Sequence, residues 1–243
     1  MAKNAVTVVV PVGPDPRYLD YLMECLASIV EQMEAGDEIL IVDDQAHLSS
    51  EFLAPVPVPE GAHLSYVATE WLLGCADAWN MGVSLACNEW CILMGSDDKL
   101  LPECLSTCRE EINRRGHDPL GYYNLTCLLD SGEKVSAFNN AAMVSRSLWK
   151  HTGGFPPSAG VGAPDALLIS IMMVHLPQHL LQLREGRPLY WVRSGEHQDT
   201  RKQAALFNWE AIQIRDKETA RWQKPTWADS VQSRFPIDRK YLE

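Results

Sequence analysis

The sequence predicts an α/β fold in which a mostly parallel central sheet is flanked by helices. Within the first 45 residues, a β-branched apolar run, a segment with apolar residues at helical spacing and a second apolar run follow one another. Such strand–helix–strand units build parallel sheets with helices on both faces. Hydrophobic residues make up 46% of the 243 residues, enough for a large core. We expect one domain over residues 1–200, with a C-terminal helix and tail over residues 201–243 packed on it.

The first half of the chain alternates strands and helices. Residues 7–12 are rich in valine and lead into a loop of prolines and glycine, which predicts a buried first strand. Apolar residues at helical spacing predict a helix over 18–33, and residues 38–42 form a second apolar run that ends at Asp43 and Asp44. The same criteria predict further strands and helices at 64–67, 73–86, 90–94 and 102–115.

The second half of the chain is less regular. Residues 122–129 and 134–138 are separated by an Asp-Ser-Gly turn, which predicts a hairpin. A short strand near 141–144 and a glycine-rich loop over 153–162 follow. The remaining predicted elements are helices at 164–174 and 202–222.

Acidic residues stand at three predicted strand ends or helix starts. Asp43 with Asp44 and Asp97 with Asp98 follow buried strands, and Asp165 opens a helix. Ligands of parallel sheets bind at the carboxyl ends of the strands, and adjacent carboxylates there favour a cation or hydrogen-bond donors. Hard oxygen ligands suit Mg²⁺ or Mn²⁺. The alternative interpretation is that these acids only cap turns and helix ends.

An ordered series of short motifs resembles glycosyltransferase family 2, whose members are inverting enzymes with the GT-A fold. The resemblance covers roughly residues 5–200 and depends on the order and spacing of the motifs. They are the strand with Pro11, Ile41-Val42-Asp43-Asp44, Gly74 to Gly82 with Asn80, Ser96-Asp97-Asp98, Ala141 to Arg146, Gly153-Gly154-Phe155 and Pro164-Asp165. Two positions depart from the family pattern, because Gly95 and Pro164 stand where acidic residues are usual.

The resemblance implies a binding site for a nucleotide-sugar donor, most plausibly a UDP-sugar. Asp43 or Asp44 is expected to hydrogen-bond the base and ribose of the nucleotide. The full set of donor-binding residues implied is Pro11, Val12, Gly13, Asp43, Asp44, Asn80, Ser96 and Asp97.

The resemblance also implies a catalytic centre with a divalent metal, Mn²⁺ or Mg²⁺, on the donor diphosphate. Asp97 and Asp98 are the expected metal ligands, and His197 is a candidate third ligand or diphosphate contact. Asp165 is expected to act as the general base that deprotonates the acceptor hydroxyl. Basic residues that could neutralise phosphate, or remain solvated charges, are Arg193, Arg201 and Lys202.

Charge and cysteine content restrict the partners and the location. A formal net charge of −11 argues against a general nucleic-acid binder, although residues 184–243 carry 12 basic and 9 acidic side chains. The acceptor therefore stays open between a glycan and a modified nucleic-acid base, and an oligomer is possible. Seven scattered cysteines predict reduced, buried thiols without zinc, and no apolar run is long enough for a membrane span. We expect a cytoplasmic protein.

A second functional class remains open from the sequence. A relative without catalytic activity could keep the nucleotide-sugar pocket, or a carbohydrate pocket, and lack turnover. Gly95 favours this alternative, because it removes one acid from the metal motif. Asp97, Asp98 and Asp165 favour the enzyme.

Overall fold

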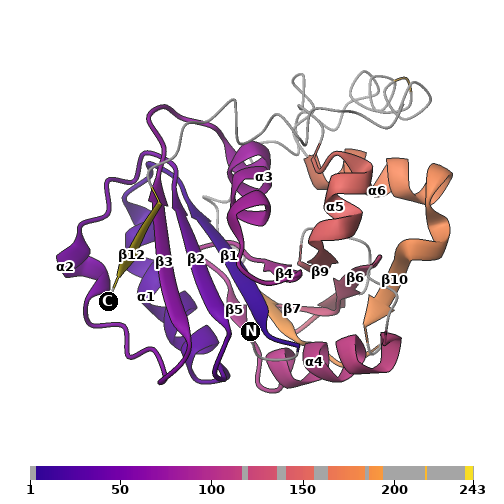
Figure 1. The fold of residues 1–243 in the computed structure, drawn as a ribbon, viewed down its shortest axis with the longest axis horizontal. Helices are drawn as coiled ribbons and strands as arrows, with labels where there is room; N and C mark the ends of the chain where they lie inside the picture. Colours follow the sequence, from indigo (N-terminus) through magenta and orange to yellow (C-terminus); the bar gives the residue numbers. More distant parts are fainter. Residues whose placement is uncertain are drawn as a thin grey trace.

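The computed structural model describes residues 4–116, 120–135, 141–155, 164–183, 186–193, 217 and 239–242, and only the backbone of residues 164–167 and 239–242. Its main element is an eight-stranded sheet in the order β10-β6-β9-β4-β1-β2-β3-β12 (Figure 1). The strands are β1 (Val6–Val12), β2 (Glu38–Asp43), β3 (His63–Ala68), β4 (Trp90–Leu93), β6 (Tyr122–Leu125), β9 (Ala142–Ser145), β10 (Leu180–Leu183) and β12 (Arg239–Leu242). The strands β4, β1, β2 and β3 are parallel, whereas β9 and β12 run antiparallel to their neighbours. The predicted fold class is confirmed.

A second, smaller sheet lies beside the first in the order β5-β11-β7-β8. Its strands are β5 (Lys99–Leu100), β7 (Cys127–Leu129), β8 (Lys134–Val135) and β11 (Tyr190–Val192). The strand β11 is antiparallel to β5 and parallel to β7. Because β5 directly follows Asp97 and Asp98, this pairing brings a segment from late in the chain next to the acidic residues.

Helices cover both faces of the large sheet. They are α1 (Arg17–Val30), α2 (Ser50–Leu53), α3 (Cys75–Leu85), α4 (Cys104–Arg115), α5 (Arg146–Thr152) and α6 (Pro164–His175). On β1, Val8 and Val10 pack in one cluster with α1 and α4, whereas Val9 packs in the other with α3, α5 and α6. Strands buried on both faces need continuous apolar sequence, which explains the valine-rich run that starts the chain.

Most elements lie where the sequence predicts them. The predicted strands at 7–12 and 38–42 are found, and the helix predicted over 18–33 ends earlier, at Val30. The hairpin is formed by β7 and β8, but residues 122–129 are not one strand. The chain divides at Thr126, whose carbonyl accepts a hydrogen bond at 2.9 Å from the N–H of Leu189, the residue before β11. This contact separates β6 in the large sheet from β7 in the small one.

Several predictions fall partly outside the described residues. The helix expected over 202–222 and the domain boundary at residue 200 both lie there, so they stay predictions. The strand β12 near the C-terminus pairs with β3 of the large sheet. Five cysteines are buried as predicted, but Cys75 and Cys87 are exposed. No helix within the described ranges has the length and hydrophobicity needed to cross a membrane.

A buried carboxylate joins three strands at the amino end of the sheet. Glu38 is fully buried at the start of β2 and accepts hydrogen bonds from the hydroxyls of Thr7 on β1 and Ser65 on β3 at 2.9 and 2.7 Å. The Cys87 N–H, which follows α3, donates to the same carboxylate at 2.8 Å. Hydrogen bonds to both oxygens offset the cost of burying the charge.

The helix α3 packs on β1 through a glycine. A methyl group added at Gly82 would lie 2.2 Å from Val9 Cγ1 and 3.3 Å from Val42 Cγ2. The absence of a side chain at Gly82 lets α3 approach the sheet closely.

Gly82→Ala is expected to lower the free energy of unfolding by about 1–3 kcal/mol, because overpacking outweighs the better helix propensity of alanine. Chemical denaturation of the variant measures this loss. Val9→Ala makes room for the added methyl group, so the double variant should lose less than the sum of the two single variants. Strict additivity would show that Gly82 does not set the helix–sheet distance.

Candidate functional site

The carboxyl ends of β1, β2 and β4 form one edge of the sheet. The Asp44 N–H donates to the Val12 carbonyl at 2.8 Å, and the Met94 N–H donates to the Val9 carbonyl at 3.1 Å. The predicted donor residues Pro11, Val12 and Gly13 therefore lie on the same edge as the two acidic pairs.

The Asp43 carboxylate is fully used by its own loop and by β3. Its Oδ1 accepts the N–H groups of Ala46 and His47 at 2.7 and 3.0 Å. Its Oδ2 accepts the Leu48 N–H at 2.7 Å and the Tyr66 hydroxyl at 2.6 Å. A carboxylate has about four acceptor positions, so this one has none left. Burial, followed by the contact with Asp43, raises the pKa of Tyr66, which keeps its hydroxyl a donor.

The Asp44 carboxylate holds the loop that leads into α3. Its Oδ1 accepts the Leu73 N–H at 2.7 Å and the Thr69 hydroxyl at 3.1 Å, and its Oδ2 accepts the Gly74 N–H at 2.8 Å. Among the described residues, three of about four acceptor positions are used. Within this part of the chain, Asp44 therefore fixes the loop and keeps the capacity for one more hydrogen bond.

Asn80 joins α3 to the turn after α5. Its side-chain amide donates to the Phe155 carbonyl and accepts the Phe155 N–H, both at 2.9 Å. Gly154, the residue before Phe155, has a φ of +72°. A Cβ at this position would lie 2.4 Å from the Asn80 Oδ1. Asn80 is fully buried, so these contacts show it as a support for the edge of the sheet.

The acidic turn, defined as residues 95–98, follows β4 and is held by the strand β11. The Tyr190 hydroxyl donates to Asp98 Oδ2 at 2.8 Å, and the Arg193 N–H donates to Asp98 Oδ1 at 2.9 Å. The Gly95 N–H donates to the Tyr190 oxygen at 2.9 Å. Ser96 in this turn is buried.

Gly95 leaves a space between the two carboxylates of the acidic turn. A methyl group at this position would lie 2.8 Å from Asp98 Oδ2 and 3.0 Å from Asp97 Oδ1. A side chain at position 95 would therefore require the carboxylates of Asp97 and Asp98 to shift from their present positions.

The Asp98 carboxyl is costly to ionise in the acidic turn. Burial, and next the charge of Asp97, raise the pKa of Asp98 to about 8. Beneath the turn, the Cys25 thiol donates to the Gly95 carbonyl at 3.7 Å. Burial and the two aspartates raise the pKa of Cys25, so this thiol stays neutral. Carboxylates strained by desolvation and by a like charge are typical of functional sites.

The Arg193 side chain is not a solvated loop charge. Its guanidinium lies 3.9 Å from the centre of the Tyr21 ring and 4.9 Å from that of Trp191. Its Nε donates to the Asp97 carbonyl at 2.9 Å, and it pairs with Glu24 at 3.0 Å. Arg193 therefore connects α1, β11 and the acidic turn.

The remaining predicted catalytic residues cannot be placed by their side chains. Asp165 lies in the first turn of α6, where only the backbone is described. His197, Arg201 and Lys202 lie outside the described residues. No cluster of three or more potential metal-ligating side chains occurs within the described part of the chain.

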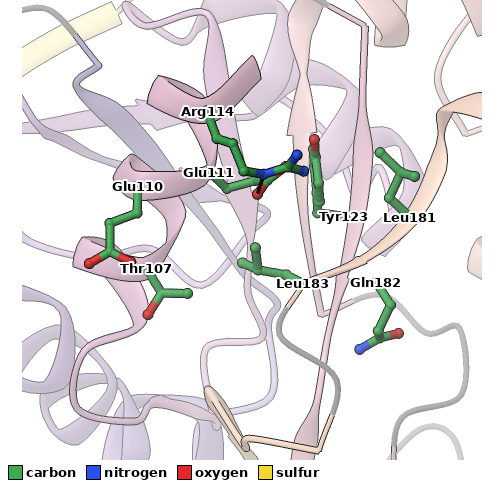
Figure 2. Close-up of a pocket in the computed structure, with 8 residues that line it drawn as sticks. All are labelled: Thr107, Glu110, Glu111, Arg114, Tyr123, Leu181, Gln182 and Leu183. Atoms are coloured by element: carbon green, nitrogen blue, oxygen red, sulfur yellow. Dashed lines mark hydrogen bonds and ion pairs between the residues drawn. The ribbon is translucent and has the colours of Figure 1, made fainter. Parts of the chain in front are cut away.

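A pocket on other elements lies apart from this edge. Figure 2 shows the side chains of α4, β6 and β10 that line this pocket. The pocket has a volume of about 330 Å³. Its lining residues are Thr107, Glu110, Glu111, Arg114, Tyr123, Leu181, Gln182 and Leu183. None of them belongs to the acidic turn or to the predicted donor site.

Comparison with known proteins finds a similarity to one family of transferases. Residues 7–122, just under half of the chain, match the model of Glycosyl transferase family 2. The match contains the acidic turn and the predicted donor residues, whereas Asp165 and His197 lie beyond it.

One curated relative is also a glycosyltransferase. Glycosyltransferase GlyG of Streptococcus pneumoniae is 28% identical over 121 residues, which are 49% of this chain and 39% of GlyG. The chain therefore matches less than half the length of this curated relative.

Solved structures share the fold. S. aureus TarS 1-349 in complex with UDP-GlcNAc has a TM-score of 0.68 at 16% identity, covering 96% of this chain and 71% of TarS 1-349. The mannosyltransferase PcManGT from Pyrobaculum calidifontis, in complex with GDP-Man and Mn²⁺, has a TM-score of 0.57 at 17% identity, covering 94% and 68%. At such identities the likeness shows the fold alone.

Asp43→Asn is expected to lower the free energy of unfolding by about 1–3 kcal/mol. The NH₂ group that replaces one carboxylate oxygen cannot accept a hydrogen bond, so some of the N–H and O–H donors around it lose their partner. Denaturant unfolding without any ligand measures this loss. Asp20→Asn, at an exposed position in the first turn of α1, is the control and should change stability by less than about 0.5 kcal/mol. Equal stabilities of the two variants would contradict the structural role of Asp43.

Proposed function

We propose that the protein transfers a sugar from a nucleoside diphosphate sugar, a UDP-sugar, to an acceptor hydroxyl with inversion at the anomeric carbon. The observation that carries this proposal is the pair of adjacent carboxylates, Asp97 and Asp98, in the turn that follows β4 at the carboxyl edge of the sheet. Ligands of α/β sheets bind at this edge. The UDP-GlcNAc complex of TarS and the GDP-Man complex of PcManGT support the same ligand class, since both proteins share this fold.

The acidic turn suits a divalent cation, Mn²⁺ or Mg²⁺. Two adjacent carboxylates lie in this turn, and such ions commonly combine one or two carboxylates with phosphate oxygens of a substrate. A bound cation would stabilise the charge that develops on the departing nucleoside diphosphate. The PcManGT complex with Mn²⁺ supports a divalent metal, and Asp97 and Asp98 are the proposed ligands. His197 is proposed as a further ligand or diphosphate contact on the family resemblance alone.

Of the two candidate nucleotide contacts, Asp44 is the better supported. Asp43 uses all of its acceptor positions within the protein, whereas Asp44 has one left for a hydroxyl of the ribose. Main-chain groups of Pro11, Val12 and Gly13 are proposed to line the same donor pocket, because they lie on the same edge. Asp43 then acts indirectly, by holding residues 46–48 in place.

Asp165 is proposed as the general base. Its position in the first turn of α6 supports a negative charge there, because the helix dipole stabilises the carboxylate. The acceptor oxygen bonds to the anomeric carbon on the face opposite the leaving group, and the bond from that carbon to the phosphate oxygen breaks. The acceptor proton passes to Asp165. This displacement inverts the configuration without a covalent enzyme intermediate.

The acceptor, the assembly state and the location stay predictions. A glycan acceptor and a modified nucleic-acid base both fit the sequence, and acceptor specificity depends on the remaining part of the chain. An oligomer and a cytoplasmic location are equally untested.

The protein is titrated with UDP-, GDP-, CMP- and TDP-sugars in the presence of Mn²⁺ or of EDTA. We expect it to bind one nucleotide sugar selectively, and more tightly with Mn²⁺. Thermal shift reports binding, and release of free nucleotide reports turnover. Asp165→Asn should lower release by about 100-fold or more while donor binding persists, because general-base catalysis contributes on this scale. Asp20→Asn, also an aspartate in the first turn of a helix, should behave as the wild type.

Three outcomes separate the candidate functions. Donor binding without any release would favour a relative that binds nucleotide sugars without turnover. Full activity of Asp165→Asn would remove the proposed base but keep the transferase. Absence of stabilisation by every donor, with or without metal, would contradict the nucleotide-sugar site itself.

A further inference from the structure

The Tyr190 hydroxyl lies between the backbone and the carboxylate of the acidic turn. It accepts the Gly95 N–H at 2.9 Å and contacts Asp98 Oδ2 at 2.8 Å. Tyr190 itself is 3% exposed and pairs with Leu100 across β11 and β5. A phenol has one proton, and since Gly95 can only donate, that proton goes to Asp98. Burial and the charge of Asp98 raise the pKa of Tyr190, so the hydroxyl remains a donor.

Arg193 fixes the other side of the same turn by its backbone and its side chain. The N–H donates to Asp98 Oδ1 at 2.9 Å, and Nε donates to the Asp97 carbonyl at 2.9 Å. The guanidinium is itself held between Tyr21 and Trp191 and paired with Glu24. Each Asp98 oxygen thus receives one hydrogen bond, which leaves about one acceptor position on each for another ligand.

We propose that Tyr190 and Arg193 are positioning residues that orient the Asp98 carboxylate, and hold the main chain at Asp97, for the divalent cation. This inference rests on the proposed function of the acidic turn. Donors that fix a ligating carboxylate also set its affinity for the metal, typically by 10–100-fold. In this chain they fix Asp98 directly, and position 95 supplies no further carboxylate.

A purely structural role explains these contacts less well. The strand β11 is already held by backbone pairing to β5 and β7, and this pairing does not need the phenol hydroxyl. The hydroxyl instead reaches beyond the strand to the acidic turn. Removing the hydroxyl therefore tests the orientation of Asp98 while the aromatic ring keeps its packing.

Tyr190→Phe is expected to weaken Mn²⁺ binding about tenfold. Electron paramagnetic resonance of free Mn²⁺, titrated with the full chain in the presence of UDP, measures the dissociation constant without turnover. UDP binding in EDTA should stay within about twofold of the wild type, because the phenol does not belong to the proposed nucleotide pocket. Tyr123→Phe is the matched control, since Tyr123 is another buried tyrosine and lies on the separate pocket of Figure 2.

Arg193 provides a second, independent variant. Arg193→Ala keeps the backbone N–H to Asp98 but loses the contact with the Asp97 carbonyl, so Mn²⁺ binding should weaken severalfold. Arg193→Lys retains the charge without the planar group that stacks between two rings, and an intermediate dissociation constant is expected. Thermal unfolding of each variant establishes that the protein is folded at the temperature of the titration.

The outcomes distinguish this inference from the proposed function. If the wild type binds Mn²⁺, and the folded variants Tyr190→Phe and Arg193→Ala bind it with the same dissociation constant, the positioning role is overturned. The transferase proposal would stay intact. Equal weakening by Tyr123→Phe would also overturn it, because the effect would then be a general loss of packing. A wild type that binds neither Mn²⁺ nor any nucleotide sugar would overturn the proposed function, and this inference with it.

Discussion

The repulsion between the adjacent carboxylates of Asp97 and Asp98 is the constraint around which the carboxyl edge of the sheet is arranged. Every described contact to Asp98 reduces the cost of this repulsion: the Tyr190 hydroxyl on one oxygen and the Arg193 N–H on the other. Burial, followed by the charge of Asp97, still raises the pKa of Asp98 to about 8. A positive charge at the turn would favour the ionised carboxylate.

The other buried carboxylates show what full compensation looks like. Glu38 at the amino edge and Asp43 at the carboxyl edge receive hydrogen bonds on both oxygens from surrounding strands and loops. They hold β1, β2 and β3 together and have no evident capacity for a ligand. The distinction between a structural acid and a ligand-binding acid therefore lies in the number of donors that the fold directs at it. Asp44 lies between these two extremes, with one acceptor position left.

Local sequence patterns predict the main strands and helices of the fold, but they do not predict the residues that hold the acidic turn. The valine-rich β1, the helix α1 and the strand β2 carry their periodicity within a few tens of residues, and the acidic residues follow the strands directly. The contact between Tyr190 and Asp98 spans 92 positions and depends on a three-residue strand without any pattern of its own. Likewise, the sequence could not separate Asp43 from Asp44, because the donors around each come from loops whose path is set by tertiary packing.

Gly95 changes meaning once the geometry of the turn is known. From the sequence it is a lost acid, which suggests weaker metal binding or none. In the fold, a Cβ at this position would lie 2.8 Å from Asp98 Oδ2 and 3.0 Å from Asp97 Oδ1, so a side chain there would require these carboxylates to shift. The divalent cation proposed above would need oxygen ligands beyond these two carboxylates, and the diphosphate of the proposed donor would supply them. On this proposal the cation and the nucleotide sugar would bind cooperatively, because each would complete the site of the other.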